Sequence, residues 1–295
     1  MKHFFGFLII VGFLGSCEKV LPYKLPYEGD KLVINGLIDA TKVISVNLSH
    51  TVAPTGTHSQ DLSVANATVQ LWENGQYLQQ LSYNQAGNYL SPSGLMPKIG
   101  STYQLKVAAT GFPDAESSIE KIPNMPILLS HSFQDSALES INSLLAGKLS
   151  LKLKDNIGEN KYRILIEGEK DGQVQNIGYF WLLNGTINNP ERCGFLPISY
   201  ASFSFSDICI ENQTFEIQIG IEIQGWDSTG ISISFDKIKV HIQQISEDYY
   251  EYNKSLIQPE GLENAFAEGT SLYSNITGGY GIWATAASKV IVISL

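Results

Sequence analysis

The 295-residue chain contains few basic residues and very few cysteines. Lysine and arginine total 19 against 29 acidic residues, which gives a formal net charge of −10, and Arg163 and Arg192 are the only arginines. Binding to duplex nucleic acid requires cations clustered along the phosphates, and no stripe of lysine and arginine is present. The three cysteines are too few for a disulfide-dense scaffold or a cysteine-rich zinc site. These classes of protein are therefore excluded.

The motifs of common enzyme classes are also missing. The sequence has no Gly-x-Ser-x-Gly turn for a serine nucleophile, no Cys-x-x-Cys, and no pair of histidines spaced along one helix face as in zinc proteases. A glycosidase needs two carboxylates at a defined separation, which a sequence alone does not show. We therefore predict a protein that is not an enzyme, with no catalytic residues, no metal site and no cofactor. The histidines are scattered: His3, His50, His58, His131 and His241.

An apolar run occupies residues 4–14, near the start of the chain. As a helix it spans about 17 Å, against about 30 Å for a bilayer core, so it suits a signal peptide better than a membrane span. It leads into Leu14-Gly15-Ser16-Cys17, which resembles a bacterial lipobox. This resemblance implies cleavage after residue 16 and acylation of Cys17, with palmitate among the acyl chains. The alternative is an ordinary secretory signal followed by a chance cysteine.

Residues 17–30 have the composition of a tether. They contain Pro22, Pro26 and Gly29 and show little hydrophobic periodicity. Acyl chains on Cys17 bury enough methylene groups to anchor a protein in a membrane. We therefore expect residues 1–16 to be a lipoprotein signal peptide and residues 17–30 to connect the lipid to the folded part.

Alternating β-type patterns dominate residues 31–122. Asn74-Gly75 lies between two such segments, 68–73 and 76–81, and this dipeptide is a strong hairpin signal because both positions require positive φ. In 101–109, Tyr103, Leu105 and Val107 share one face. Two prolines then interrupt regular pairing at 122–126. We predict an immunoglobulin-like β-sandwich over residues 31–122.

The second half, residues 127–295, continues the same pattern. Alternation recurs at 149–153, 161–167, 215–223 and 231–245. Residues 136–145 are predicted as a short helix, and a longer helix is predicted to follow Ser246, with Ser246 as its cap. The predicted fold is all-β, an N-terminal immunoglobulin-like sandwich plus a second β-sandwich-like domain with one C-terminal helix.

Several segments together resemble a Bacteroidota lipoprotein family known as domain of unknown function 4249. Its members commonly occur beside TonB-dependent outer-membrane receptors, so the resemblance implies an accessory role in uptake, and it provides no catalytic residues to carry over. Surface export in this phylum is associated with an acidic run after the lipidated cysteine; here Lys19 follows Glu18, which leaves the face of the membrane open. The matching segments are 17–20, 31–38, 44–49, 65–75, 97–103, 111–113, 248–250 and 273–282.

Cys193 and Cys209 are the cysteines that remain if Cys17 is acylated. An exported protein meets an oxidising compartment, so we predict a disulfide between them. The alternative is a pair of buried free thiols. A bridge over this 16-residue spacing would stabilise the fold by about 3 kcal/mol in the chain-entropy model.

Aromatic residues supply the candidate contact sites. Tyr249, Tyr250 and Tyr252 either form an anchor for a partner or pack the helix onto a sheet. The glycine-rich segment Gly278-Gly279-Tyr280 lacks the residues of a phosphate loop. It is expected to form a turn before a strand, or to make a functional contact.

These observations favour an acylated cell-envelope lipoprotein attached to the outer membrane. We expect a non-enzymatic accessory or binding partner of a TonB-dependent receptor in nutrient uptake. The alternative is an independent surface lipoprotein that binds a glycan or a peptide. Nucleic acid is not an expected partner, and the sequence leaves open the ligand and whether the protein faces the cell surface or the periplasm.

Overall fold

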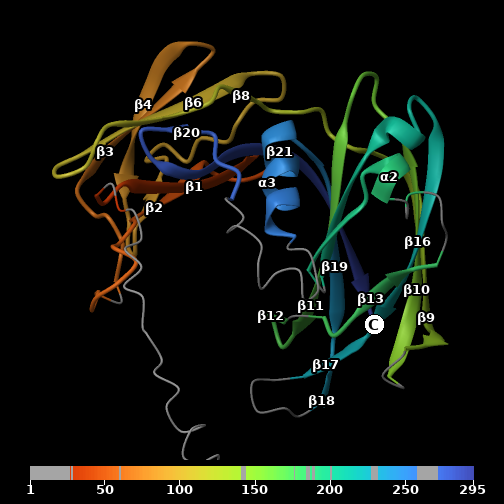
Figure 1. Cartoon of the computed structure of the whole chain (residues 1–295). Helices are drawn as coiled ribbons and strands as arrows, with labels where there is room; N and C mark the ends of the chain where they lie inside the picture. The colour runs from red at the N-terminus through yellow and green to blue at the C-terminus, as the bar shows by residue number, and fades with distance from the viewer. Residues whose placement is uncertain are drawn as a thin grey trace, which may run out of the picture. The chain divides into compact units, whose positions relative to one another are not determined.

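The computed structural model (Figure 1) describes residues 27, 29–59, 61–140, 144–175, 177–183, 187, 190–199, 201–226, 232–257 and 272–295. The predicted signal peptide, Cys17 and most of the tether lie outside the described residues. The chain divides into two compact units. In the first, residues 1–29 and 52–58, the described part has no helix or strand. All elements below belong to the second, Asp30–Thr51 and Ser59–Leu295.

The first eight strands lie within residues 32–121. The predicted hairpin joins β3 to β4, and Asn74 and Gly75 have the expected positive φ values of 51° and 76°. Tyr103, Leu105 and Val107 of β6 are all buried, so the predicted alternation is confirmed. The strands are β1 Leu32–Asp39, β2 Ser45–His50, β3 Ala67–Glu73, β4 Gln76–Tyr83, β5 Asn88–Leu90, β6 Thr102–Ala109, β7 Ala115–Ser117 and β8 Glu120–Lys121.

The second half also consists mainly of strands. Its helix α3, Glu247–Leu256, is the only described helix longer than one turn. The remaining elements are β9 Ile127–Glu139, β10 Leu145–Lys154, β11 Lys161–Lys170, β12 Gln173–Gln175, β13 Phe180–Leu182, α2 Pro190–Cys193, β14 Leu196–Ser199, β15 Ser202–Ser206, the 3-10 turn η1 Asp207–Cys209, β16 Thr214–Glu222, β17 Gln224–Trp226, β18 Ser232–Ser234, β19 Lys237–Ile245, β20 Ile276–Thr277 and β21 Tyr280–Ser294.

The helix predicted at 136–145 is wrong. Strand β9 continues to Glu139, and Leu138 and Glu139 pair with Ala146 and Leu145 of β10. Ser136 has a φ of 48°, and the register shifts between Ala146 and Lys148. An irregularity of this kind lets a strand continue after a local bend, so pairing with β10 overrides the helical preference of this segment.

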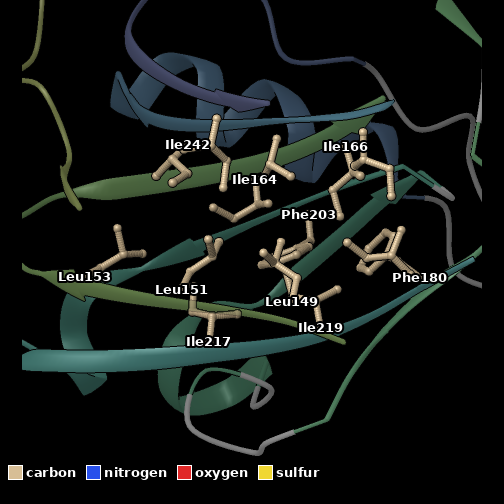
Figure 2. Packing of buried hydrophobic residues seen from close by; sticks show 14 of the residues in the cluster. Leu149, Leu151, Leu153, Ile164, Ile166, Phe180, Phe203, Ile217, Ile219 and Ile242 are labelled. Carbon is tan, nitrogen blue, oxygen red and sulfur yellow. The ribbon is translucent and has the colours of Figure 1, made fainter. Parts of the chain in front are cut away.

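The second half packs two sheets face to face. One sheet has the order β13-β16-β10-β9, and the facing strands are β15, β11 and β19 of the large sheet. Figure 2 shows the side chains from the two sheets meeting in the interior. The all-β class, with sandwich packing and a C-terminal helix, is confirmed. The buried residues labelled in Figure 2 include Leu149, Leu151, Leu153, Ile164, Ile217, Ile219 and Ile242.

Strand β21 takes part in both halves of the large sheet. Its first part, Tyr280–Ala286, runs parallel to β1, and its last part, Ala286–Ser294, runs antiparallel to β19 (Figure 1). Trp283 is fully buried in the N-terminal core, whereas Ile291 and Ile293 belong to the second core. The predicted domain bounds, 31–122 and 127–295, stay a prediction. One strand contributes side chains to both cores.

Candidate functional site

Helix α3 follows β19 directly and lies against β14 and β21. Ser246 precedes the helix with extended backbone, but its side chain makes no capping hydrogen bond to the helix. Its hydroxyl oxygen instead accepts a hydrogen bond from the backbone N–H of Thr285 at 3.3 Å. The predicted side-chain cap is therefore wrong, because the hydroxyl joins the start of α3 to β21.

Two of the predicted contact tyrosines on α3 face the body of the protein. Tyr250 is 6% exposed and its hydroxyl donates to the carbonyl of Gly194 at 2.5 Å. Burial raises the pKa of Tyr250 to about 12. Tyr249 packs against a small buried cluster that includes Ile245, and the Cζ atom of Arg163 lies 5.6 Å from the centre of its ring. These contacts fit the packing alternative for both residues.

The third tyrosine of α3, Tyr252, lines an open pocket of about 430 Å³ together with Tyr273 and Tyr280. The ring of Tyr280 is 47% exposed, and the ammonium of Lys31 lies 5.3 Å from its centre. We call this surface the tyrosine pocket. Tyrosine rings combine an apolar face with a polar edge, which suits contact with an apolar or ring-shaped group. The other lining residues are Val33, Asn35, Leu272, Ser274 and Gly281.

The glycine-rich segment forms the turn between β20 and β21. Gly278 has a φ of 77°, and a Cβ atom there would lie 2.1 Å from the carbonyl oxygen of Asp114. At Gly279 a Cβ would lie 2.6 Å from the carbonyl oxygen of Leu32. Both positions are thus packed against backbone, where a side chain has no space. Of this segment, it is Tyr280 that reaches the tyrosine pocket.

A partly buried polar cluster lies beside the pocket, centred on the carboxylate of Asp248. The hydroxyl of Tyr273 donates to Asp248 Oδ1 at 2.8 Å, and the amide of Asn275 donates to Oδ2 at 2.6 Å. Ser118 Oγ lies 3.0 Å from the same Oδ2 and 3.1 Å from Oε1 of Glu120. We call these five residues the Asp248 cluster. It connects α3 to the segments before β8 and before β21.

Asn275 also holds the backbone of β21 in place. Its side-chain oxygen accepts from the N–H of Trp283 at 2.9 Å, and its amide nitrogen lies 2.7 Å from the carbonyl oxygen of the same residue. The backbone of Asn275 accepts from the N–H of Ser118 at 2.9 Å. The cluster therefore fixes both the start of α3 and the strand that carries Tyr280.

The two carboxyl groups of the cluster have opposite pKa shifts. Burial raises the pKa of Glu120 to about 7, and the nearby carboxylate of Asp248 adds to this increase. Burial also acts to raise the pKa of Asp248, but hydrogen bonds from Asn275, Tyr273, Glu120 and Ser118 outweigh it and lower the pKa. Burial and the bond to Asp248 raise the pKa of Tyr273. Two neighbouring carboxyl groups whose pKa values are shifted in opposite directions are typical of functional sites, because burial and nearby charges set which of the two holds a proton.

Only part of this cluster is predictable from the sequence. Asp248, Tyr273 and Asn275 fall within segments that carry the family resemblance, but no sequence pattern marks them as one site. Ser118 and Glu120 had no distinguishing pattern. They reach Asp248 through contacts across more than 100 positions of sequence, which no local periodicity records.

The other chemistry-bearing residues are dispersed. In the described part of the chain, no group of three or more histidine, cysteine, aspartate or glutamate side chains is arranged to hold a metal ion. His241 Nε2 lies 2.8 Å from Glu167, and Glu169 pairs with Lys237 and Lys239. No described helix is long and apolar enough to cross a membrane.

Cys193 and Cys209 are joined by a disulfide bond in the structure. It connects α2 to the turn η1. Cys193 is fully buried. The bridge is therefore part of the packing of the second half and lies outside both the tyrosine pocket and the Asp248 cluster.

A family model described as "Domain of unknown function (DUF4249)" matches residues 18–290. The chain belongs to this family. The match includes every residue of the tyrosine pocket and of the Asp248 cluster. No curated protein matches the chain.

Among solved structures, a chain described as "Biofilm associated protein - BSP domain" is similar at 11% identity with a TM-score of 0.23. The alignment covers 95% of this chain and 62% of that one, so the family member spans less than two thirds of the solved chain. At this TM-score the similarity carries no argument about fold or function.

Proposed function

We propose that this family member is a non-enzymatic lipoprotein, attached to the outer membrane through Cys17, that binds a TonB-dependent receptor as an accessory protein in nutrient uptake. The tyrosine pocket is its contact surface. The observation that carries the proposal is the convergence of Tyr252, Tyr273 and Tyr280 from separate segments around one open pocket. Aromatic residues in such pockets dominate the energetics of many protein interfaces.

The lining of the pocket favours a protein partner over a glycan. Apart from the tyrosine hydroxyls, the polar side chains in the lining are those of Asn35 and Ser274, and Tyr273 already donates to Asp248. Recognition of a sugar needs several convergent hydrogen-bonding groups in addition to a ring for stacking. An apolar side chain of a partner needs mainly the rings and exposed Leu272. The independent glycan- or peptide-binding lipoprotein therefore remains the second candidate.

The test uses the full lipidated chain, tagged at its C-terminus and gently solubilised from outer membranes. Mass spectrometry identifies the proteins that copurify with it. We expect a stoichiometric TonB-dependent receptor, lost when Tyr252 and Tyr280 are both replaced by alanine. Cys17→Ala tests the anchor, since it should release the protein from the membrane fraction.

The matched control is Tyr77→Ala, because Tyr77 is 54% exposed on β4, outside the tyrosine pocket. It should leave receptor recovery unchanged. Recovery of the wild-type protein without a receptor would contradict the accessory role. Binding of the purified protein to a glycan array, lost in the double tyrosine variant, would then establish the second candidate.

A further inference from the structure

The Asp248 cluster has more hydrogen-bond acceptors than donors around its serine. Ser118 has one hydroxyl proton, yet its Oγ lies 3.1 Å from Glu120 Oε1 and 3.0 Å from Asp248 Oδ2. The third close neighbour of this oxygen, the amide of Asn275 at 2.7 Å, is itself a donor. The single proton serves one carboxyl group at a time. A proton on Glu120 would supply the missing donor between the two acids.

Tyr273 belongs to both the Asp248 cluster and the tyrosine pocket. The hydroxyl of Tyr273 donates to Asp248, while Tyr273 also lines the pocket. Its backbone N–H donates to Ser255 Oγ at 3.0 Å, and Ser255 donates to the carbonyl of Tyr252 at 2.7 Å. Asp248 is therefore connected by a hydrogen bond to Tyr273, and through Tyr273 and Ser255 to Tyr252.

We propose that Glu120 and Asp248 share one proton and that loss of this proton shifts Tyr273, so that the tyrosine pocket exists in a protonated and a deprotonated form. In the protonated form, Glu120 donates to Asp248, and Asp248 accepts from Tyr273. When the proton leaves to water, the buried carboxylate of Glu120 and the partly buried carboxylate of Asp248 repel each other. The repulsion displaces Asp248 and with it Tyr273. This inference rests on the proposed function only in treating the tyrosine pocket as the binding surface.

The surroundings of Glu120 leave Asp248 as its dominant charged neighbour. From the start of α3, Ser246 also bonds to its carboxyl group. Four charged residues share with Glu120 the lining of a second open pocket of about 440 Å³: Lys121, Glu159, Lys161 and Glu247. Lys161 pairs with Glu247 at 3.3 Å, so it is not free to neutralise the acid pair. The pKa of Glu120, raised by burial to about 7, places the change near neutral pH.

The experiment follows the pocket itself and needs no ligand. The protein is labelled with tyrosine carrying carbon-13 at Cζ, which leaves the phenol pKa unchanged, and the Cζ resonances of Tyr252, Tyr273 and Tyr280 are assigned by single replacement with phenylalanine. Spectra are recorded from pH 5 to pH 8.5. We expect the Tyr273 resonance to show one transition with a midpoint near the Glu120 pKa of about 7, while Tyr77 on β4 stays constant. Ionisation of the tyrosines does not interfere, because burial raises the pKa of Tyr273 further above its ordinary value of 10.

Two variants identify the groups that titrate. Glu120→Gln keeps the shape of the side chain and should remove the transition. Asp248→Asn removes the second carboxylate and with it the repulsion, so it should also remove the transition. Glu116→Gln is the control, since Glu116 is an exposed acid paired with Lys106 at 3.3 Å, and it should leave the transition in place.

A Tyr273 resonance that is constant over this pH range in the wild-type protein would overturn the proposal, and this result does not depend on any variant folding. A transition that persists in a folded Glu120→Gln protein would overturn it as well. The outcome is independent of receptor copurification. A titrating Tyr273 in a protein that recovers no receptor would retain the proton switch and reject the proposed partner.

Discussion

The structure contains two hydrogen-bonded clusters, one buried and one partly buried, each built from two acids and a tyrosine. Their acids are held by different kinds of donor. In the second sandwich, Asp155 accepts from the hydroxyl of Tyr162 at 2.7 Å and from the N–H of Asn212 at 2.8 Å, and Asp207 accepts from the N–H of Asn160 at 2.7 Å. We call this the Asp155 cluster. In the Asp248 cluster, the acids accept hydrogen bonds from the side chains of Ser118, Tyr273 and Asn275.

The kind of donor determines how firmly each acid is held. Backbone N–H groups fix Asp155 and Asp207 as part of the fold, so that these acids hold two loops together. Side chains are more adjustable donors than backbone, and the Asp248 cluster adjoins an open pocket through Tyr273. We therefore expect substitutions in the Asp155 cluster to change mainly the free energy of unfolding. Substitutions in the Asp248 cluster should also change how that free energy depends on pH.

The largest expected effect is that of Asp155→Ala. The change leaves the hydroxyl of Tyr162, which is 1% exposed, and the N–H of Asn212 without their acceptor. The unsatisfied buried hydroxyl costs about 1–3 kcal/mol and the lost bond of the Asn212 N–H about 1 kcal/mol more, so we expect a loss of about 4 kcal/mol in the free energy of unfolding. Urea denaturation measures it. The control is Asp135→Ala, because Asp135 is exposed. A loss below about 1 kcal/mol for Asp155→Ala would contradict a structural role of Asp155.

The second-largest effect is the change of stability with pH that Glu120 causes in the Asp248 cluster. Glu120 binds its proton more tightly when folded, with a pKa of about 7, than at its ordinary value of 4.5. The folded state therefore holds the extra proton between these values, and stability falls as pH rises through this window. One pKa unit corresponds to about 1.36 kcal/mol, so the loss is about 3 kcal/mol by pH 8.

Glu120→Gln should flatten this dependence, as measured by urea denaturation between pH 5 and pH 8. The lowered pKa of Asp248 acts in the opposite direction, and its contribution is lost only as pH falls below its ordinary value of 3.8. Burial raises the pKa of Asp207, so a smaller decline of the same sign persists in the variant. An equal slope in the wild type and in Glu120→Gln would place the titrating group elsewhere.

A smaller effect is expected from Tyr273→Phe. It removes one hydrogen bond to a charged acceptor, and such bonds contribute about 1.5–3 kcal/mol. Tyr162→Phe is the corresponding change in the Asp155 cluster. It removes the bond to Asp155 and also the acceptor of the Asn156 N–H at 3.2 Å, so it should be the more destabilising of the two. A larger loss for Tyr273→Phe than for Tyr162→Phe in thermal or urea denaturation would contradict this ranking.

The smallest effect on stability is that of Tyr280→Ala. The ring is 47% exposed and contacts Lys31 at the surface, so we expect a change within about 0.5 kcal/mol. Recovery of the receptor should nevertheless decrease strongly. Unfolding curves that match the wild type, together with unchanged copurification, would exclude Tyr280 as a contact.

Local patterns predicted much of the fold. Alternation located β6, β10 and β19, the Asn-Gly pair located the β3–β4 hairpin, and the helix predicted after Ser246 is α3. The segment 136–145 failed because pairing with β10 overrides its local preference.

The candidate site was predictable only in part. Tyr252 and Tyr280 could be chosen as aromatic residues, but their meeting depends on the parallel pairing of β1 with β21, about 247 positions apart. The same pairing and the contact of β8 with β21 bring Glu120 near Asp248. Hydrophobic periodicity reports only local structure, so a single sequence does not show contacts between residues this far apart.

The double role of β21 has a consequence for the order of events in folding. Val33–Asp39 pairs with residues that are synthesised 247 positions later, and the same strand supplies Ile291 and Ile293 to the second core. Contacts of high sequence separation form slowly, because the loop between them must close first. Neither core is complete until residues 280–294 arrive. We therefore expect the two halves to become protected from proteolysis together, once β21 has paired with both β1 and β19.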